Sequence, residues 1–292
     1  MFSPLASLPR RIVSLAPSNT EILFALGLGP RVVGVDDDSD YPPEVAGLPR
    51  VGRDLQIDVD GVAALRPDLV LASLSVPGMG RNVAALVERG LPHLTLDPRS
   101  LPDVLASIER TGRATGATDE AARLVAALRA RLEAVGRATA SLPAAARPAV
   151  HWEWWPRPLI VAGRQSWITG MLALAGARNL YAEEDVTSRP VDDAAVLAAD
   201  PGAVIASYCG ARTLLAPEKI AARPGWAALR AVRDGRVFVL LEAAFGRPGP
   251  RLVDGVELLC GLLHPGLLPA ADAALARRPE EVRALALEAI RR

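Results

Sequence analysis

Apolar and polar positions alternate in blocks along the first 116 residues, as expected for strands and helices that follow one another. Continuous apolar runs indicate buried strands of a parallel sheet that is covered on both faces. These runs occupy residues 11–15, 31–35, 68–72 and 92–96. Segments of helical character lie at 18–26, 59–65, 80–89 and 101–115. This alternation predicts an α/β lobe with right-handed crossovers.

The second half of the chain repeats features of the first half. Residues 62–73 resemble residues 196–207, and each stretch reads as a helix end, a proline turn and a buried strand. Gly27 and Gly176 each follow a helical segment, where glycine supplies a left-handed cap. The repeat predicts two similar lobes, although any α/β protein repeats such units to some degree.

A long amphipathic segment separates the two halves. Its apolar positions recur at intervals of three and four and predict one helix over residues 118–140. These positions are Ala122, Val125, Leu128, Leu132 and Val135. We therefore expect two Rossmann-like α/β lobes with parallel sheets, joined by one long helix, with a ligand cleft between them.

The predicted organisation has four parts. They are an N-terminal lobe (1–116), a bridging helix (117–142), a C-terminal lobe (143–265) and a helical tail (266–292). Within the C-terminal lobe the pattern predicts strands at 147–155 and 237–240 and a helix at 251–263. In the tail it predicts an amphipathic helix near 279–290.

The amino-acid composition disfavours several classes of protein. The 292 residues include 33 Lys and Arg and 33 Asp and Glu, so the net charge is zero, which disfavours nucleic-acid binding. No apolar run is long enough to span a membrane, so no membrane insertion is expected. The first residues show no basic leader, which predicts a cytoplasmic location for the chain as written, and a periplasmic one if a leader has been removed. The cysteines Cys209 and Cys260 form no disulfide framework, although a single bridge stays possible.

Several motifs resemble one family in the same order. They are Arg11-Ile-Val-Ser-Leu-Ala-Pro-Ser-Asn-Thr-Glu21, Asp40-Tyr-Pro-Pro43, Leu65-Arg-Pro-Asp-Leu-Val70, Ser188-Arg-Pro190 and Arg247-Pro-Gly-Pro-Arg251. Over residues 10–265 the chain resembles the substrate-binding proteins of ABC importers for vitamin B12 and iron-siderophores, and most closely the cobalamin-binding subgroup.

The resemblance implies a non-catalytic protein without a cofactor or a metal site of its own, which binds its ligand between two lobes. It also implies docking on an ABC permease through one acidic residue on each lobe. Asp60 fits the first lobe, whereas Phe245-Gly246-Arg247 offers no acid where the second is expected. Cobalamin receptors carry aromatic residues on their N-terminal loops, where this chain has Asp36–Asp38, Asp54 and Ser73.

Ligands of parallel α/β folds bind beyond the carboxyl ends of the strands, and this rule selects the candidate binding residues. They are Pro17, Ser18, Asn19, Asp36, Asp37, Asp38, Asp54, Ser75, Met79, Arg81, His151, Trp152, Trp154, Trp155, Tyr208, Glu242, Phe245 and Arg247.

Three of the candidate residues are tryptophans that lie close together in the sequence. Trp152 and Trp154 face the same way on a strand, and Trp155 leaves the strand toward Pro156. Adjacent tryptophans on opposite faces cannot both be buried in one thin core layer. We therefore expect Trp154 or Trp155 to cover a flat ligand, with core packing as the alternative.

The acidic residues Asp36–Asp38 and the segment 77–81 each have two interpretations. Asp36, Asp37 and Asp38 either form a solvated loop or favour a cationic or amide-rich ligand. The segment 77–81 is either a flexible loop or a donor of backbone N–H groups to an anion. The histidines are far apart in sequence, and His151 beside Trp152 is the one best placed to approach a corrin cobalt.

The sequence thus predicts non-catalytic binding of a corrinoid or another metal chelate. The protein would act as an importer receptor or as a cytoplasmic carrier or sensor derived from one. The alternatives are a siderophore- or haem-binding protein and a tetrapyrrole metal chelatase on the same fold. A chelatase needs a base and a metal-holding group close together, and the scattered histidines favour binding instead.

Overall fold

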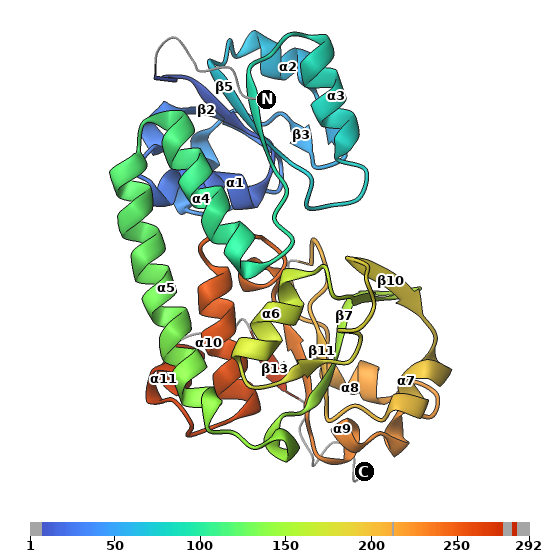
Figure 1. Cartoon of the computed structure of the whole chain (residues 1–292). Helices are drawn as coiled ribbons and strands as arrows, with labels where there is room; N and C mark the ends of the chain where they lie inside the picture. Colours follow the sequence, from blue (N-terminus) through green and yellow to red (C-terminus); the bar gives the residue numbers. More distant parts are fainter. Residues whose placement is uncertain (1–7, 212, 277–281, 285–292) are drawn as a thin grey trace. The chain divides into compact units, whose positions relative to one another are not determined.

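The computed structural model describes residues 8–211, 213–276 and 282–284 (Figure 1). Its contacts divide the chain into two compact units. Unit 1 comprises Met1–Arg129 and Pro248–Pro250, and unit 2 comprises Ala130–Arg247 and Arg251–Arg292. Both units are α/β folds, which confirms the predicted fold class. The four-part domain limits inferred from the sequence stay a prediction.

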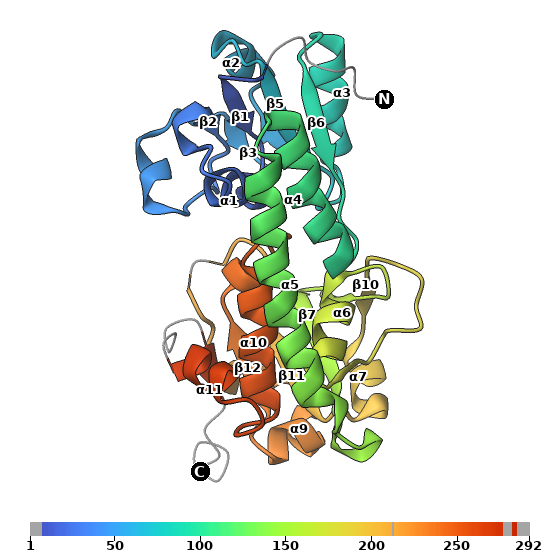
Figure 2. The ribbon, with the colours of Figure 1, turned by 60° about the vertical axis from the view of Figure 1, so that its left-hand side comes forward.

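A parallel sheet with the strand order β2-β1-β5-β6 forms the centre of unit 1. Its strands are β1 (Ile12–Ser14), β2 (Val32–Val35), β5 (Leu69–Ser73) and β6 (His93–Leu96). Its helices are α1 (Pro17–Ala25), α2 (Val59–Ala64), α3 (Gly80–Glu88) and α4 (Leu101–Thr115). Helices α1 and α4 contact each other, as do α2 and α3, and one pair covers each face of the sheet (Figure 2). Each of these elements lies within one residue of its predicted ends.

The core of unit 1 explains why its strands could be predicted from the sequence. On β1 and β5, Val13 and Val70 pack toward Val62 of α2 and Leu86 of α3. The neighbouring Ile12 is also fully buried. Since both faces of the sheet are covered, every position on these strands is apolar or small. The short hairpin of β3 (Gly52–Arg53) and β4 (Gln56–Ile57) was not predicted.

Helix α5 (Thr118–Ala140) begins and ends where the sequence predicted. Gly116 adopts a left-handed conformation with φ 74° between α4 and α5. The buried stripe contains Ala121 rather than the predicted Ala122, because Ala121 packs against Gly112 at the corner between the helices. Within unit 2, Arg131 of α5 binds Asp254 and Glu257, each at 2.6 Å, which attaches the second half of the helix to α10 (Leu252–Leu263).

Unit 2 contains a mixed sheet of strand order β10-β8-β7-β11-β12-β13, with β9 paired to β7. The strands are β7 (Ala149–Pro156), β8 (Leu159–Ala162), β9 (Arg178–Asn179), β10 (Ser188–Val191), β11 (Ala203–Ala206), β12 (Val237–Leu240) and β13 (Val282–Ala284). Strands β9, β7, β11 and β12 are parallel, as predicted for this lobe. Strand β8 runs antiparallel to β7, because the chain turns directly from β7 into β8 instead of crossing over through a helix. Strand β10 pairs antiparallel with β8, and β13 pairs antiparallel with β12.

Helices cover both faces of the unit 2 sheet. Those on one face are α7 (Asp193–Ala199), α8 (Pro217–Ala221) and α9 (Arg230–Arg233), whose side chains join a cluster with Val204 and Val237. Helix α6 (Trp167–Leu174) contacts α10, and α11 (Pro269–Ala276) packs on α10 as well. The helix predicted near 279–290 lies mostly outside the described residues. Its described part, 282–284, is strand β13, so the prediction was wrong there.

The internal repeat is visible in the backbone. Helix α2 leads into β5 as α7 leads into β11, at equivalent positions of the two units. Arg66 and Asp200, at matching positions of the repeat, have φ of 49° and 40°, values that non-glycine residues rarely adopt. Gly27 and Gly176 have φ of 74° and 78° after α1 and α6, which confirms their predicted left-handed conformations. The repeat therefore includes the turns as well as the strands.

Candidate functional site

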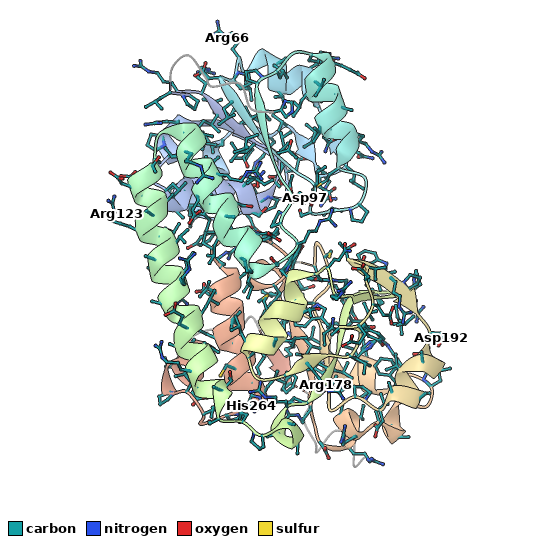
Figure 3. All side chains as sticks on the ribbon, in the orientation of Figure 1. Arg66, Asp97, Arg123, Arg178, Asp192 and His264 are labelled. Carbon is teal, nitrogen blue, oxygen red and sulfur yellow. The ribbon has the colours of Figure 1, made fainter. Side chains whose placement is uncertain are left out.

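The carboxyl ends of the parallel strands define one candidate edge in each unit. We call the loops after β1, β2 and β5, together with the β3–β4 hairpin, the unit 1 edge, and the loops after β7, β11 and β12 the unit 2 edge. Figure 3 labels Arg66, which precedes β5, and Asp97, which follows β6, at opposite ends of the unit 1 sheet. The predicted binding residues lie at these two edges or directly beneath them.

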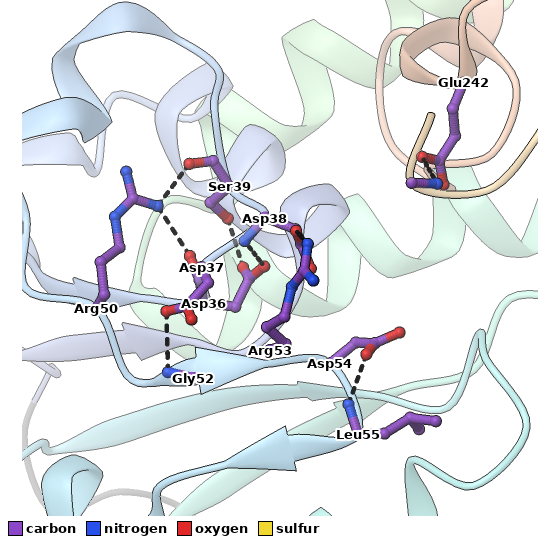
Figure 4. Close-up of polar contacts among 11 residues, drawn as sticks. Asp36, Asp37, Asp38, Ser39, Arg50, Gly52, Arg53, Asp54, Leu55 and Glu242 are labelled. Atoms are coloured by element: carbon purple, nitrogen blue, oxygen red, sulfur yellow. Dashed lines mark hydrogen bonds and ion pairs between the residues drawn. The ribbon is translucent and has the colours of Figure 1, made fainter. Parts of the chain in front are cut away.

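Asp36 is a structural residue of the unit 1 edge and not an exposed acid. Its side chain is completely buried and accepts hydrogen bonds from Ser39 Oγ at 2.5 Å and from the Asp38 backbone N–H at 3.0 Å (Figure 4). Arg50 donates to the backbone carbonyls of Asp36 and Ser39 at 2.9 and 2.6 Å. These bonds satisfy the polar groups of the loop after β2, so the prediction that Asp36 meets a ligand is corrected.

Asp37, Asp38 and Asp54 keep accessible carboxylates but also hold the β3–β4 hairpin. Asp37 accepts from the backbone N–H of Gly52 at 3.1 Å, and Asp38 pairs with Arg53 at 3.0 Å (Figure 4). The hydrogen bond to Asp38 raises the pKa of the Arg53 guanidinium. Asp54 accepts from the N–H of Leu55 at 2.7 Å. These contacts attach the acidic loop to the hairpin, while Asp37 stays exposed and Asp38 and Asp54 are half-buried.

The remaining candidates of unit 1 differ in accessibility. Ser18 and Asn19 are buried at the start of α1, and Asn19 donates to the carbonyl of Ala72 at 3.1 Å, so Asn19 joins α1 to β5. Pro17 is half-buried beside them. Buried Ser18 and Asn19 are better explained by packing than by ligand contact.

The loop after β5 ends in the start of α3. Ser75 is half-buried and shares a 2.8 Å hydrogen bond with Ser73, while Met79 is only 3% exposed. Arg81 is exposed, and its Nε donates to the carbonyl of Gly78 at 3.2 Å. Of the predicted residues on this loop, Arg81 is the one whose side chain lies in the open.

The tryptophans of β7 divide into buried and exposed side chains. Trp152 is fully buried, Trp154 is 9% exposed and Trp155 is 48% exposed. Trp152 packs against the rings of Trp154 and Phe245, with centroids 5.7 and 5.5 Å apart. Trp152 therefore belongs to the core, which corrects its assignment as a binding residue, and Trp155 presents the open aromatic face at the unit 2 edge.

Phe245 and Glu242 follow β12. Phe245 is fully buried, and its carbonyl accepts from Trp167 Nε1 at 2.7 Å, so Phe245 is also a core residue and not a ligand contact. Glu242 is half-buried and accepts from the backbone N–H of Gly210 at 2.6 Å (Figure 4). Arg247 is half-buried. Glu242 thus connects the loop after β12 to the loop after β11.

His151 lies in the core of unit 2, which removes it as a ligand to a corrin cobalt. Its side chain is fully buried, and Nδ1 lies 2.9 Å from the hydroxyl of Tyr181. Its ring meets the Trp226 ring edge to face at 5.8 Å. Burial, with a smaller effect of Arg223, lowers the pKa of His151 to about 3. The imidazole is therefore neutral in the folded protein at neutral pH.

This burial predicts a pH dependence of stability. Unfolded His151 has an ordinary pKa near 6.5 and binds a proton more readily than the folded form, so its contribution is complete above about pH 6.5 and is lost as the pH falls toward 3. Between pH 7 and 5 the parent should lose about 2 kcal/mol more unfolding free energy than a His151→Gln variant. Urea unfolding of both proteins at several pH values tests this, and parallel pH profiles would contradict it.

The remaining predicted residue, Tyr208, follows β11 and is half-buried. Its hydroxyl donates to Glu153 at 3.3 Å and accepts from Arg223 at 3.2 Å. Sequence reasoning missed Glu153 and Arg223. A carboxylate between two tryptophans on an apolar strand was the signal for Glu153, since such an acid needs a buried partner. No comparable signal marks Arg223, because arginine is frequent throughout the chain.

A groove of about 340 Å³ lies on the α7 side of unit 2. It is lined by Pro156, Arg157, Pro158, Leu159, Val191, Asp192, Asp193, Arg223 and Pro224. Neither Trp155 nor the loop after β12 lines it, so its volume alone does not mark the ligand site.

Within the described ranges, no group of three or more His, Cys, Asp or Glu side chains could hold a metal ion. No helix in that part of the chain is long and apolar enough to cross a membrane. Cys209 is exposed and Cys260 is buried, and no disulfide joins them.

The fold agrees with comparisons to known proteins. A model of the periplasmic binding protein family matches residues 12–244. The chain belongs to this family. It is 34% identical over 260 residues to the uncharacterized ABC transporter substrate-binding lipoprotein YvrC of Bacillus subtilis, covering 88% of this chain and 81% of that protein.

Two solved structures are also similar. The periplasmic vitamin B12 binding protein BtuF of Vibrio cholerae has a TM-score of 0.74 and 28% identity, covering 87% of this chain and 96% of that one. A periplasmic heme binding protein from Pseudomonas aeruginosa has a TM-score of 0.74 and 32% identity, covering 89% of this chain and 94% of that one.

Membership of this family confirms the resemblance inferred from the sequence motifs. It also confirms the prediction of a ligand-binding protein that is not an enzyme. The relatives are described as a lipoprotein and as periplasmic proteins, so the predicted cytoplasmic location has no support among them.

Proposed function

We propose that the chain binds a large, partly planar metal chelate, with a corrinoid as the first candidate, and delivers it to an ABC permease. The observation that carries the proposal is the 48% exposed Trp155 at the unit 2 edge. A flat apolar ring at the end of a parallel strand suits the face of a macrocycle. The similarity to a vitamin B12 binding protein supports this ligand class. Binding between the two units stays a prediction.

The unit 1 edge favours an amide-rich ligand. Its carboxylates, those of Asp37, Asp38 and Asp54, accept hydrogen bonds and donate none when they are ionised. They suit the amide N–H groups at the rim of a corrin better than the carboxylates of a haem. Arg53 and Arg81 at the same edge supply donors for other groups. Haem is the second candidate, because a heme binding protein is 32% identical to this chain.

A permease is the proposed protein partner. Asp60 is exposed in the first turn of α2, where it pairs with Arg89. The internal repeat places Ala194 of α7 at the matching position of unit 2, next to the exposed Asp193. The acid of the second unit is therefore proposed at the start of α7 rather than near 245–247. Since the relatives are described as lipoprotein or periplasmic, we propose that the chain acts outside the cytoplasm.

Absorption spectra test the ligand class directly. The purified chain is incubated separately with cobinamide, cobalamin, haem and a ferric siderophore, and is then passed through a desalting column. We expect a corrinoid spectrum to elute with the protein. Retention of haem or siderophore alone would replace the corrinoid proposal, and retention of none would contradict the proposed function.

A further inference from the structure

A buried ion pair lies directly beneath the unit 2 edge. Glu153 of β7 has no exposed surface, and its Oε1 accepts from Arg223 Nη1 at 2.7 Å. Arg223 follows α8, its side chain is 16% exposed, and its guanidinium lies over the Trp226 ring at 4.5 Å. Trp226 Nε1 donates in turn to Asp193 at 2.7 Å. Arg223 is therefore held by contacts on two sides.

The same pair reaches the loop after β11, residues 207–210. The Tyr208 hydroxyl lies between the two charges, 3.3 Å from Glu153 Oε2 and 3.2 Å from Arg223 Nη2. The backbone of the loop is bound to β7 as well, through Ser207 N–H to the carbonyl of Glu153 at 2.9 Å. One carboxylate and one guanidinium thus connect β7, the 207–210 loop and the turn after α8.

Stability alone does not explain why charges occupy this place. Burial raises the pKa of the Glu153 carboxyl, and Arg223 opposes that rise. Replacing a buried ion pair by packed apolar residues is often neutral or stabilising, because the charges no longer lose their hydration. Directional hydrogen bonds, in contrast, determine where a partner group lies.

We infer that Glu153 and Arg223 are positioning residues that hold Tyr208, and with it the 207–210 loop, in the arrangement that receives the ligand. The inference rests on the proposed function for its link to binding. The geometric part, that the pair holds the loop, does not depend on any ligand. Arg223 cannot be replaced by lysine in this role, since a single ammonium does not match the planar fork that serves Glu153 and Tyr208 together.

The test compares the full parent chain with three variants. Glu153→Leu/Arg223→Met replaces the pair by apolar side chains, and Tyr208→Phe removes only the hydroxyl. The matched control, Glu133→Gln/Arg137→Gln, removes an exposed ion pair on α5. If the first variant does not fold, Glu153→Gln keeps the shape of the side chain and removes its charge.

Cys209 gives a readout that needs no ligand. It is exposed within the 207–210 loop, whereas Cys260 is buried. We expect the rate of reaction with a thiol reagent to rise severalfold in the apolar-pair and Tyr208→Phe variants and to stay unchanged in the control. A Cys209→Ser substitution in each background assigns the signal. Equal rates in all proteins would overturn the inference.

Affinity gives the second readout. With cobinamide as the probe, the apolar-pair variant should bind about tenfold more weakly than the parent while its urea midpoint stays close to that of the parent. If the variant is destabilised enough to explain its weaker binding, the pair has only a structural role, and the inference is overturned. If the parent binds none of the four compounds, the proposed function fails, and the thiol rates alone decide whether the pair positions the loop.

Discussion

Replacing Trp155 by alanine should weaken binding of the ligand by about ten- to a thousand-fold, or roughly 1.4–4 kcal/mol. A tryptophan face buries at most about 150–250 Å², and apolar burial contributes roughly 25 cal/mol per Å² before the costs of association are counted. Trp155 is the tryptophan of β7 with a large exposed surface, at 48%. Calorimetric titration of the parent and the variant with cobinamide measures the loss.

A Trp155→Phe variant is the matched control, because it keeps an aromatic face of smaller area. It should bind with an affinity between those of the parent and the alanine variant. Since the ring is half exposed, unfolding free energy should change little in either variant. Unchanged affinity after Trp155→Ala would remove the exposed tryptophan from the site and with it the observation on which the proposed function rests.

Replacing Trp152 by alanine should act on stability, with a loss of about 3–5 kcal/mol in the unfolding of unit 2. The side chain is completely buried and packs against Trp154 and Phe245, so its removal leaves a large cavity. Urea unfolding followed by circular dichroism measures the effect. The two units need not unfold together, so the transition of unit 2 is the one to compare.

Trp152→Phe separates cavity formation from the loss of a polar group. In the described structure Trp152 Nε1 is buried without a hydrogen-bond partner, and phenylalanine removes that donor while filling much of the space. Its destabilisation should be clearly smaller than that of Trp152→Ala. An alanine variant as stable as the parent would contradict the assignment of Trp152 to the core.

The fold could be predicted from the sequence because parallel strands leave a simple signal. Strands such as β5, with both faces covered, are apolar or small at every position, and glycines such as Gly27 mark the helix ends. The antiparallel strands β8 and β10 were missed. They form one end of the sheet order, where β8 pairs with β7 through a direct turn and β10 pairs with β8. No helix connects β7 to β8, so the helical periodicity gives no signal for that pairing.

The site was harder to predict, because the position of a residue at a strand end does not determine where its side chain points. Asp36 and Asp37 are neighbours in sequence, yet Asp36 turns inward to Ser39 while Asp37 is exposed. The adjacent Trp154 and Trp155 differ in burial, with Trp155 the exposed one, and contact of Trp155 with a ligand stays a prediction. The pairing of Glu153 with Arg223 joins residues 70 positions apart, which one sequence without related sequences does not reveal.

We propose that this chain binds a corrinoid or a related metal chelate. Calorimetric titration of the full chain with cobinamide, repeated with cobalamin, haem and a ferric siderophore, tests it most directly. We expect saturable one-to-one binding of cobinamide or cobalamin, tighter than binding of haem. Titrations without saturation for all four compounds would contradict it.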